Sequence, residues 1–444
     1  MTEAARPLID LPDTRLAQAW QDAESLCIKC GFCLPACPTY RETGHEVSSP
    51  RGRLELMYRT AQGELDIGDI RHELWFCLGC MACETACPSG IRYHDMLEAA
   101  RIDDAVDLRA RNGAPLVKRF LLNRVLVRPR WLRAVAWAMW LLRHSGLRWL
   151  LGGRGLLRLL SKRLARLERR SPPIAAPRAW RPSARAWLAA DGAAQGAPDS
   201  ETARPVAMLS GCVMDAVFGR VHAATAKVLH ANGYAVHVPE RQVCCGALHH
   251  HAGEEADALT LARRNIEVFE ALGEAPVVVN SAGCGAMLKD YGKLLAGDAD
   301  WAERARRFSA RVKDVCEFLA EQPLRPPTRA VPRKVAYDDP CHLLHAQKVG
   351  QAPRALLGQV PGLELVPLAE ADWCCGSAGS YSLMQPEMSR RLLARKMGHI
   401  RASGAEVVAT GNPGCLLQLG LGARDARLKV RIAHPVELLA EAYE

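Results

Sequence analysis

Sixteen of the 17 cysteines in this chain of 444 residues fall into two spacing patterns, and thiolates at such spacings bind metals. The first pattern is C-x-x-C-x-x-C-x-x-x-C-P, and it occurs twice, at an offset of 50 residues. In the two-cluster form of this iron–sulfur signature, three cysteines of a run hold one cluster and the fourth holds the other. The sequence therefore predicts two [4Fe–4S] clusters, bound by Cys27, Cys30, Cys33 and Cys87 and by Cys77, Cys80, Cys83 and Cys37.

The second pattern is a single cysteine, a Cys-Cys-Gly step and a further cysteine, again present twice. The glycine supplies the sharp turn that two adjacent ligands need. Four thiolates per copy suit one further iron–sulfur cluster, with a structural zinc ion or reduced cysteines lining a pocket as the alternatives. Zinc is also the alternative for the first pattern, although zinc sites typically use C-x₂-C pairs. The candidate ligands are Cys212, Cys244, Cys245 and Cys284 in the first copy and Cys341, Cys374, Cys375 and Cys415 in the second.

The second pattern repeats with offsets of 129 to 131 residues, which marks an internal duplication. Each half alternates short apolar runs with stretches of helical periodicity, and this alternation predicts small α/β layers with parallel strands. The cysteines then lie where strands end and helices begin, the usual place for ligands in open α/β sheets. The expected strands are Val206–Leu209, Ala235–Val238, Val277–Val279, Lys334–Tyr337, Leu363–Val366 and Val407–Val408.

We therefore expect a multidomain chain. An α-helical two-cluster ferredoxin domain comes first, then a basic helical segment, a linker and two duplicated α/β cysteine-rich domains. The 39 residues between Cys37 and Cys77 favour a helical ferredoxin variety, with short helices at Arg53–Thr60 and Arg71–Trp75. Six prolines indicate the linker. The expected boundaries are 1–107, 108–170, 171–205, 206–325 and 326–444.

These motifs in this order resemble the iron–sulfur subunits of membrane-linked complexes that oxidise 2-hydroxy acids, in particular that of bacterial glycolate oxidase. The resemblance covers the chain apart from residues 108–205, where only the basic, amphipathic character is shared. The wider CysCysGly family often ends each motif with C-x-x-C, but Ser281 and Asn412 replace that first cysteine here, which weighs against a five-cysteine cluster of the heterodisulfide-reductase kind. Matching stretches include Cys30-Gly-Phe-Cys33, Pro50-Arg-Gly-Arg53, Cys87-Pro-Ser-Gly-Ile-Arg-Tyr-His94, Ser281-Ala-Gly-Cys-Gly-Ala286 and Cys374-Cys-Gly-Ser-Ala-Gly379.

The chain contains no dinucleotide-binding fingerprint after an expected strand and no phosphate-binding loop motif, so we expect no flavin in this chain. Iron–sulfur clusters pass single electrons, whereas oxidation of a hydroxy acid needs a two-electron organic cofactor. The resemblance implies that partner flavoprotein subunits oxidise glycolate to glyoxylate. This chain, with no catalytic residue of its own, would pass the electrons towards a quinone or another acceptor. Oxidation of lactate or glycerol-3-phosphate, and a heterodisulfide-reductase-like activity, are the alternatives.

The net charge of +10 is unevenly distributed. Residues 108–185 carry 20 Lys and Arg and the single acid Glu168, whereas the rest of the chain has 38 basic and 47 acidic residues. Around Trp131–Leu150, Arg and Trp lie beside an apolar face, which suits a helix in a membrane interface. Docking on a partner is the alternative, and no nucleic-acid-binding motif is present. Because no secretory signal and no apolar run above nine residues is found, we expect a cytoplasmic protein, peripheral on the inner face of the membrane.

Two features lie outside the cysteine patterns: a run of three histidines and a single cysteine. His249-His250-His251 follows the first Cys-Cys-Gly step, and we expect it to form a solvated loop rather than a ligand set. Cys316 belongs to no repeat and lies in an apolar stretch, so we expect it to be a buried core residue.

Overall fold

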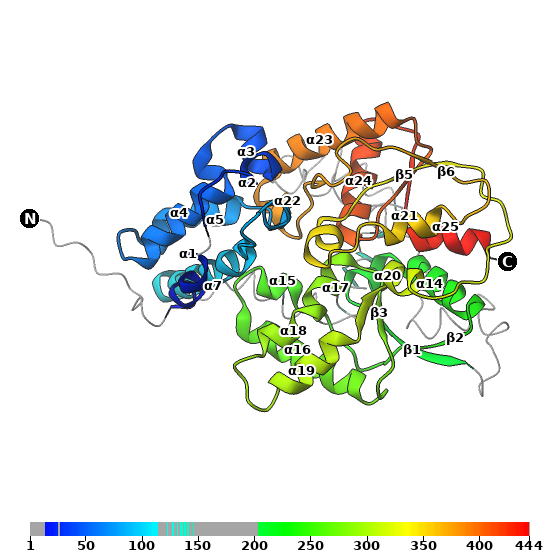
Figure 1. The fold of residues 1–444 in the computed structure, drawn as a ribbon, viewed down its shortest axis with the longest axis horizontal. Coiled ribbons are helices and arrows are strands. Elements are labelled where there is room, and N and C mark those ends of the chain that lie inside the picture. Colours follow the sequence, from blue (N-terminus) through cyan, green and yellow to red (C-terminus); the bar gives the residue numbers. More distant parts are fainter. Residues whose placement is uncertain are drawn as a thin grey trace, which may run out of the picture.

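The computed structural model describes residues 14–24, 27–113 and 203–443, with isolated positions between 122 and 145. Most of the basic segment and the linker therefore lie outside the described residues. Figure 1 shows the N-terminal helices in blue and cyan beside the first cysteine-rich half in green and the second in yellow to red. Among the described residues, no helix combines the length and the apolarity that crossing a membrane requires.

Every regular element described in residues 14–113 is a helix. The two short helices expected here are confirmed, since they fall within α4 and α5. The helix α4 begins with a proline after Ser49, whose hydroxyl accepts from the amide of Gly52 at 3.0 Å. Apolar side chains of α1, α4, α5 and α7 form one buried core. The elements are α1 (Arg15–Glu24), α2 (Cys33–Ala36), α3 (Pro38–Thr43), η2 (Glu46–Ser48), α4 (Pro50–Ala61), α5 (Ile67–Phe76), α6 (Ala82–Thr85) and α7 (Tyr93–Asn112).

Each half of the remaining chain is built on a four-stranded parallel sheet, as the alternating pattern predicted. The strand orders are β2-β1-β3-β4 and β6-β5-β7-β8. The sequence did not reveal β4 and β8, because each has three residues of mixed polarity and shows no periodicity. The strands are β1 (Arg204–Leu209), β2 (Tyr234–His237), β3 (Val277–Val279), β4 (Val312–Asp314), β5 (Lys334–Tyr337), β6 (Glu364–Val366), β7 (Val407–Ala409) and β8 (Arg431–Ala433).

In both sheets the strand order reverses at the centre, between β1 and β3 and between β5 and β7. Such a switch point leaves a crevice at the carboxyl ends of the strands. The helix that follows each of β3 and β7 begins in this crevice. The helices of the first half are α13 (Val213–Val217), α14 (Gly219–Ala231), α15 (Ala247–His250), α16 (Glu255–Glu270), α17 (Ala282–Lys289), α18 (Tyr291–Leu294), α19 (Ala302–Ala310) and α20 (Val315–Ala320). Those of the second half are η6 (His342–Ala346), α21 (Ala352–Leu357), α22 (Tyr381–Met384), α23 (Pro386–Ser403), α24 (Pro413–Asp425) and α25 (Pro435–Ala442).

The two halves pack on each other through a shared apolar core. In Figure 1 the green helix α14 lies against the red helix α25. Val221 and Leu229 of α14 and Leu439 of α25 belong to this core, and each is at most 1% exposed. Cys316 is buried in the same core, as expected. The carbonyl of Ala282 accepts from Gln347 Nε2 at 2.9 Å, so the start of α17 in the first half contacts the η6 region of the second.

Candidate metal centres

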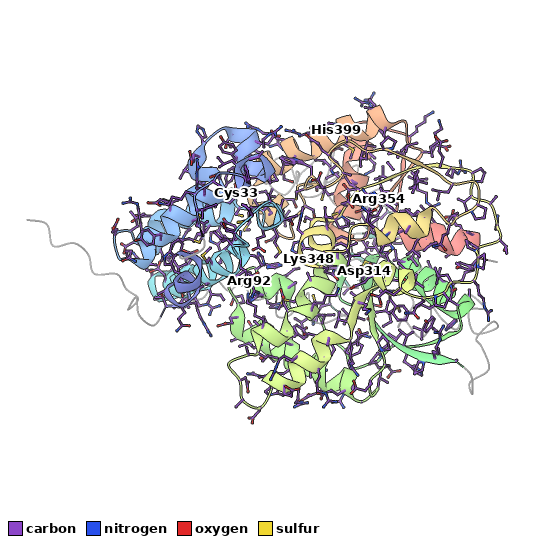
Figure 2. The ribbon with its side chains drawn as sticks, in the orientation of Figure 1. Cys33, Arg92, Asp314, Lys348, Arg354 and His399 are labelled. Atoms are coloured by element: carbon purple, nitrogen blue, oxygen red, sulfur yellow. The ribbon has the colours of Figure 1, made fainter. Side chains whose placement is uncertain are left out.

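The first cysteine run folds around a cavity at the start of α2. Cys27, Cys30 and Cys33 line this cavity together with Cys87, the last cysteine of the second run. Figure 2 shows Cys33 within the N-terminal helices. The backbone of this run turns sharply because Gly31 has a φ of 83°. Four thiols that are up to 60 residues apart in the sequence thus share one cavity.

The second cysteine run folds around a neighbouring cavity. Cys77, Cys80 and Cys83 line it together with Cys37, the last cysteine of the first run. Cys83 and the buried Tyr93 border both cavities, so the two cavities adjoin. The last cysteine of each run thus lines the cavity of the other run, and Cys83 lines both.

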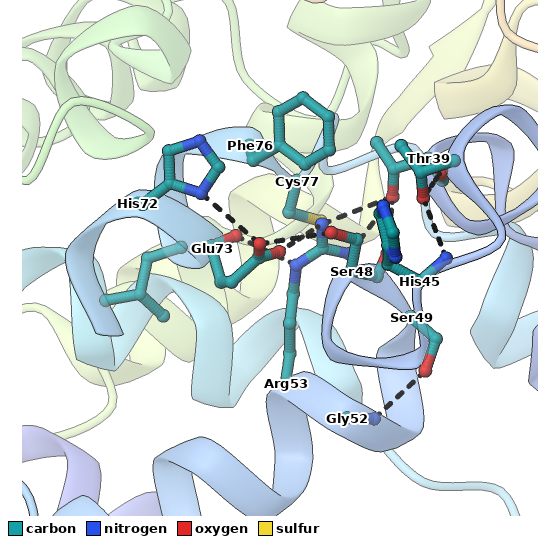
Figure 3. A network of polar contacts seen from close by, with 12 residues as sticks. Thr39, His45, Ser48, Ser49, Gly52, Arg53, His72, Glu73, Phe76 and Cys77 are labelled. Atoms are coloured by element: carbon teal, nitrogen blue, oxygen red, sulfur yellow. Dashed lines mark hydrogen bonds and ion pairs between the residues drawn. The ribbon is translucent and has the colours of Figure 1, made fainter. Parts of the chain in front are cut away.

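A buried arginine supports the second cavity (Figure 3). Arg53 of α4 is 1% exposed. Its Nε donates to the carbonyl of Glu73 at 2.8 Å, and its two terminal nitrogens donate to Thr39 Oγ1 at 3.2 Å. It also pairs with the Glu73 carboxylate at 3.2 Å. Arg53 thereby joins α3, α4 and α5 around the cavity.

The same arginine acts on a predicted ligand. Burial works against ionisation of Cys77, but the positive charges of Arg53 and Arg101 outweigh it and hold the pKa of the Cys77 thiol below its usual value. Arg101 donates to the carbonyls of Leu74 and Cys77, each at 2.8 Å. These charges favour the thiolate of Cys77, the form of cysteine that binds metals, whereas burial raises the pKa of Cys80 and Cys83 in the same cavity.

The four cysteines of the first Cys-Cys-Gly set converge in the crevice of the first sheet. Cys212 follows β1, and Cys284 lies in the first turn of α17 after β3. Cys212 Sγ is 3.6 Å from Cys244 Sγ. This contact raises the pKa of Cys212 and lowers that of Cys244, while contacts with Cys244 and then Cys284 raise the pKa of Cys245. The set therefore forms one group of thiols, of which Cys244 and Cys245 are buried.

The second Cys-Cys-Gly set repeats this arrangement in the second sheet. Cys375 Sγ is 3.4 Å from Cys415 Sγ, and the side chains of Cys341 and Cys374 contact each other. The turn at Gly376 has a φ of 80°, and a Cβ there would lie 2.8 Å from the carbonyl oxygen of Ser389. Only glycine fits this turn without strain.

The two thiol sets differ in their buried neighbours. Near the second set, Lys396 is fully buried, pairs with Asp338 at 2.8 Å and donates to the carbonyl of Glu370 at 2.7 Å. Burial opposes the charge, but Asp338 raises the pKa of Lys396 and keeps the amine protonated. Asn265, 131 residues earlier, is the neutral counterpart and donates to the carbonyl of Cys244 at 3.1 Å. The duplicated sites are therefore electrostatically unequal.

The second ferredoxin cavity lies directly against the second thiol set. Leu78 and Cys80 from the cavity pack in one apolar cluster with Cys374 and Tyr381. The Tyr381 hydroxyl donates to the carbonyl of Phe76 at 3.1 Å, which fixes this contact. Thiol-lined sites from the N-terminal domain and from the second cysteine-rich half are thus neighbours.

Comparison with known proteins identifies the domains that carry these thiol sites. A 4Fe-4S dicluster domain matches residues 24–91, and a cysteine-rich domain matches residues 206–289 and again residues 335–420. The linker region of the glycolate oxidase iron-sulfur subunit matches residues 113–170. A probable glycolate oxidase iron-sulfur subunit of Bacillus subtilis is 38% identical over 94% of this chain and 93% of its own length. The glycolate oxidase iron-sulfur subunit of Escherichia coli is 33% identical over 94% of each chain.

This chain belongs to the family of glycolate oxidase iron–sulfur subunits. The resemblance inferred from the motifs is confirmed. A lactate utilization protein A of Shouchella clausii is also similar, with 32% identity, but the match covers 53% of this chain and 98% of that protein.

The donor sets fit the iron–sulfur clusters that the dicluster and cysteine-rich domains indicate. In each of the four sites the predicted ligands are thiols, and soft thiolate ligands are those that iron–sulfur clusters use. When bound, such clusters accept and donate single electrons. The chain itself supplies thiolates, buried charge and enclosure, which set how easily an electron is accepted.

One group of polar residues was not foreseen, and one expectation was wrong. His249-His250-His251 does not form a solvated loop: His249 is fully buried, and His250 and His251 both contact the carboxylate of Glu98 on α7. Sequence spacing gave no signal, because Glu98 lies 153 residues from His251 and only domain packing joins them. The two residues that replace expected cysteines, Ser281 and Asn412, directly precede α17 and α24.

Proposed function

We propose that this chain carries electrons from flavoprotein subunits of the same complex, which oxidise glycolate to glyoxylate, towards a quinone or another acceptor. The supporting observation is that three of the thiol-lined sites adjoin one another. The two ferredoxin cavities share Cys83, and the second packs through Cys80 on Cys374. In this proposal the two cavities hold [4Fe–4S] clusters with the ligand sets given above, and the cysteine-rich halves hold one or two more. The chain alone turns over no substrate.

Glycolate is favoured over lactate as the substrate of the complex, because the glycolate oxidase subunits match more of this chain than the lactate utilization protein does. The two glycolate oxidase subunits match nearly the whole chain, including the segment between the ferredoxin and cysteine-rich regions. The lactate utilization protein matches about half of it. The segment that joins the domains is thus shared with the glycolate proteins.

The proposed function is tested with the complex purified without oxygen after co-expression with its flavoprotein subunits. Added glycolate should bleach the visible absorption of the clusters, and lactate should do so much more slowly. The chain purified alone should keep its colour with either acid. Bleaching by lactate and not by glycolate would contradict the substrate assignment, and an absence of bleaching by both acids would contradict the electron-transfer role.

An exposed apolar rim beside the first cavity is the proposed docking point for the flavoprotein. Cys30 is exposed, and its neighbours Ile28 and Phe32 are 69% and 62% exposed. Large exposed apolar side chains that border a redox site suit a partner interface.

We expect Phe32→Glu to weaken association with the flavoprotein at least about tenfold, because it places a charge in the interface core. Iron content should not change. The matched control is Val106→Glu, which alters another exposed apolar residue, 49% exposed, on α7. Affinity is measured by titrating the flavoprotein with each variant. Equal losses for the two variants would contradict docking at this rim.

The basic segment is proposed to hold the complex on the inner face of the membrane. Most of it lies outside the described residues, but four of its described side chains are large, apolar and exposed: Trp131, Val135, Trp137 and Leu141, at 49%, 41%, 49% and 43%. Trp beside apolar and basic residues suits a lipid interface.

Deletion of residues 131–170 should therefore abolish co-sedimentation with vesicles that contain anionic lipids, while the clusters remain. The full chain should sediment with these vesicles, and less so at high salt because the attraction is partly electrostatic. Unchanged sedimentation of the shortened chain, together with loss of the flavoprotein, would instead assign this segment to partner docking.

A further inference from the structure

Three histidines and one glutamate meet where the N-terminal domain contacts the first cysteine-rich half. On α7, His94 and Glu98 are one turn apart and share a face, with His94 Nε2 3.0 Å from a carboxylate oxygen. His251 Nδ1 from the first half lies 2.5 Å from the same oxygen. His250 Nε2 contacts the other oxygen. Three side chains from two domains therefore bring nitrogen and oxygen donors close together, and His250 contacts the second oxygen of the same carboxylate.

This group is enclosed and includes none of the predicted cysteine ligands. His94 and Glu98 are each 8% exposed, and the ring of His342 lies 5.9 Å from that of His251. Nearby cations have other partners: Arg101 donates to backbone carbonyls, and Lys293 pairs with Asp95. A buried carboxylate needs a compensating positive charge, and neutral imidazoles do not supply one.

We infer that His94, Glu98 and His251 bind a divalent transition-metal ion such as zinc, with His250 as a fourth ligand. Zinc lies about 2 Å from nitrogen and oxygen ligands, so donors that share it lie within about 4 Å of one another. The three donor atoms of His94, Glu98 and His251 all lie within 4.8 Å of one another, and small side-chain rotations close the difference. Imidazole and carboxylate donors suit such an ion.

The ion would join the N-terminal domain to the first cysteine-rich half, close to the sites proposed to transfer electrons. His94 also lines the second ferredoxin cavity, and His250 and His251 follow the Cys-Cys-Gly step of the first half. A bound ion would fix the position of the first thiol set relative to the second cavity. This role is structural, because zinc does not change its oxidation state.

The alternative source of positive charge is a proton on His94. Burial opposes it, but Glu98 raises the pKa of His94 to about 9. An ion has to displace this proton, because only the neutral imidazole binds a metal. The test therefore has to distinguish a bound ion from a proton.

The test uses the full chain with its clusters restored without oxygen, so that the cluster thiolates are occupied. Zn²⁺ is added, loosely bound metal is removed by gel filtration, and zinc, iron and sulfide are measured. Wild type should retain about one zinc ion per chain. Glu98→Gln and His251→Ala should each retain almost none, with iron and sulfide unchanged. The matched control is His237→Ala, which removes an exposed histidine at the end of β2 and should retain the zinc.

Two results would overturn the inference. Wild type that retains no zinc would show that Glu98 is compensated by a proton, and this measurement requires no variant. Zinc that persists equally in Glu98→Gln and His251→Ala would place it elsewhere, for example on thiols of the cysteine-rich halves. A variant that also loses iron has lost its fold, and His250→Ala, which removes the proposed fourth ligand, then takes its place.

Discussion

Cys30→Ala combined with Cys87→Ala should remove about four iron atoms per chain, no more than either change alone. Cys30→Ala combined with Cys37→Ala should remove about eight. The reason is geometric: Cys30 and Cys87 line one cavity, whereas Cys37, although close to Cys30 in sequence, lines the other. Loss of a thiolate ligand empties its own cluster site and leaves the neighbouring one.

This prediction is tested by measuring iron and acid-labile sulfide in protein prepared without oxygen. Electron paramagnetic resonance then identifies the cluster that remains. Cys316→Ala is the matched control, because Cys316 is buried in an apolar core and belongs to no ligand set. It should leave iron unchanged. If the Cys30/Cys37 pair removed only about four iron atoms, each run would hold its own cluster and the exchange of fourth ligands would be wrong. Cys30→Ala should also stop reduction of the remaining clusters by glycolate, because the flavoprotein is proposed to dock beside the first cavity.

Arg53→Met should lower the free energy of unfolding of the N-terminal domain by about 3–5 kcal/mol. The change leaves the nearly buried Glu73 carboxylate without its cation and removes the donors that Thr39 accepts from. It also removes a positive charge that favours the Cys77 thiolate, so the cluster of the second cavity should be the first to be lost.

The measurement is anaerobic urea unfolding, followed by the visible absorption of the clusters and by circular dichroism. Arg59→Met is the matched control: it lies on the same helix, is half exposed and pairs with Glu55 and Glu64 at the surface. It should cost at most about 1 kcal/mol. Adding Glu73→Gln to Arg53→Met should restore part of the loss, because it removes the unpaired charge. Equal costs for Arg53→Met and Arg59→Met would contradict this role for Arg53.

Much of the organisation of this chain can be predicted from local sequence. Six strands of the duplicated halves were found because apolar residues cluster in them, as in Val277–Val279, and the helices α4 and α5 contain the predicted ones. The strands β4 and β8 were missed because Val312–Asp314 and Arg431–Ala433 are short and mixed in polarity. Parallel neighbours, and not their own composition, make these residues strands.

The sequence alone determined which cysteines can bind metals and how they repeat, because cysteine spacing and glycine turns act within a few residues of each other. It also determined the family, since the motifs occur in one order along the chain. The tertiary structure decided which of the separate sites lie side by side. Cys80 lies beside Cys374, and Glu98 lies beside His250 and His251, across separations that no local pattern encodes. Such contacts form when different domains pack against each other, so the chemistry of these residues depends on domain packing and not on local sequence.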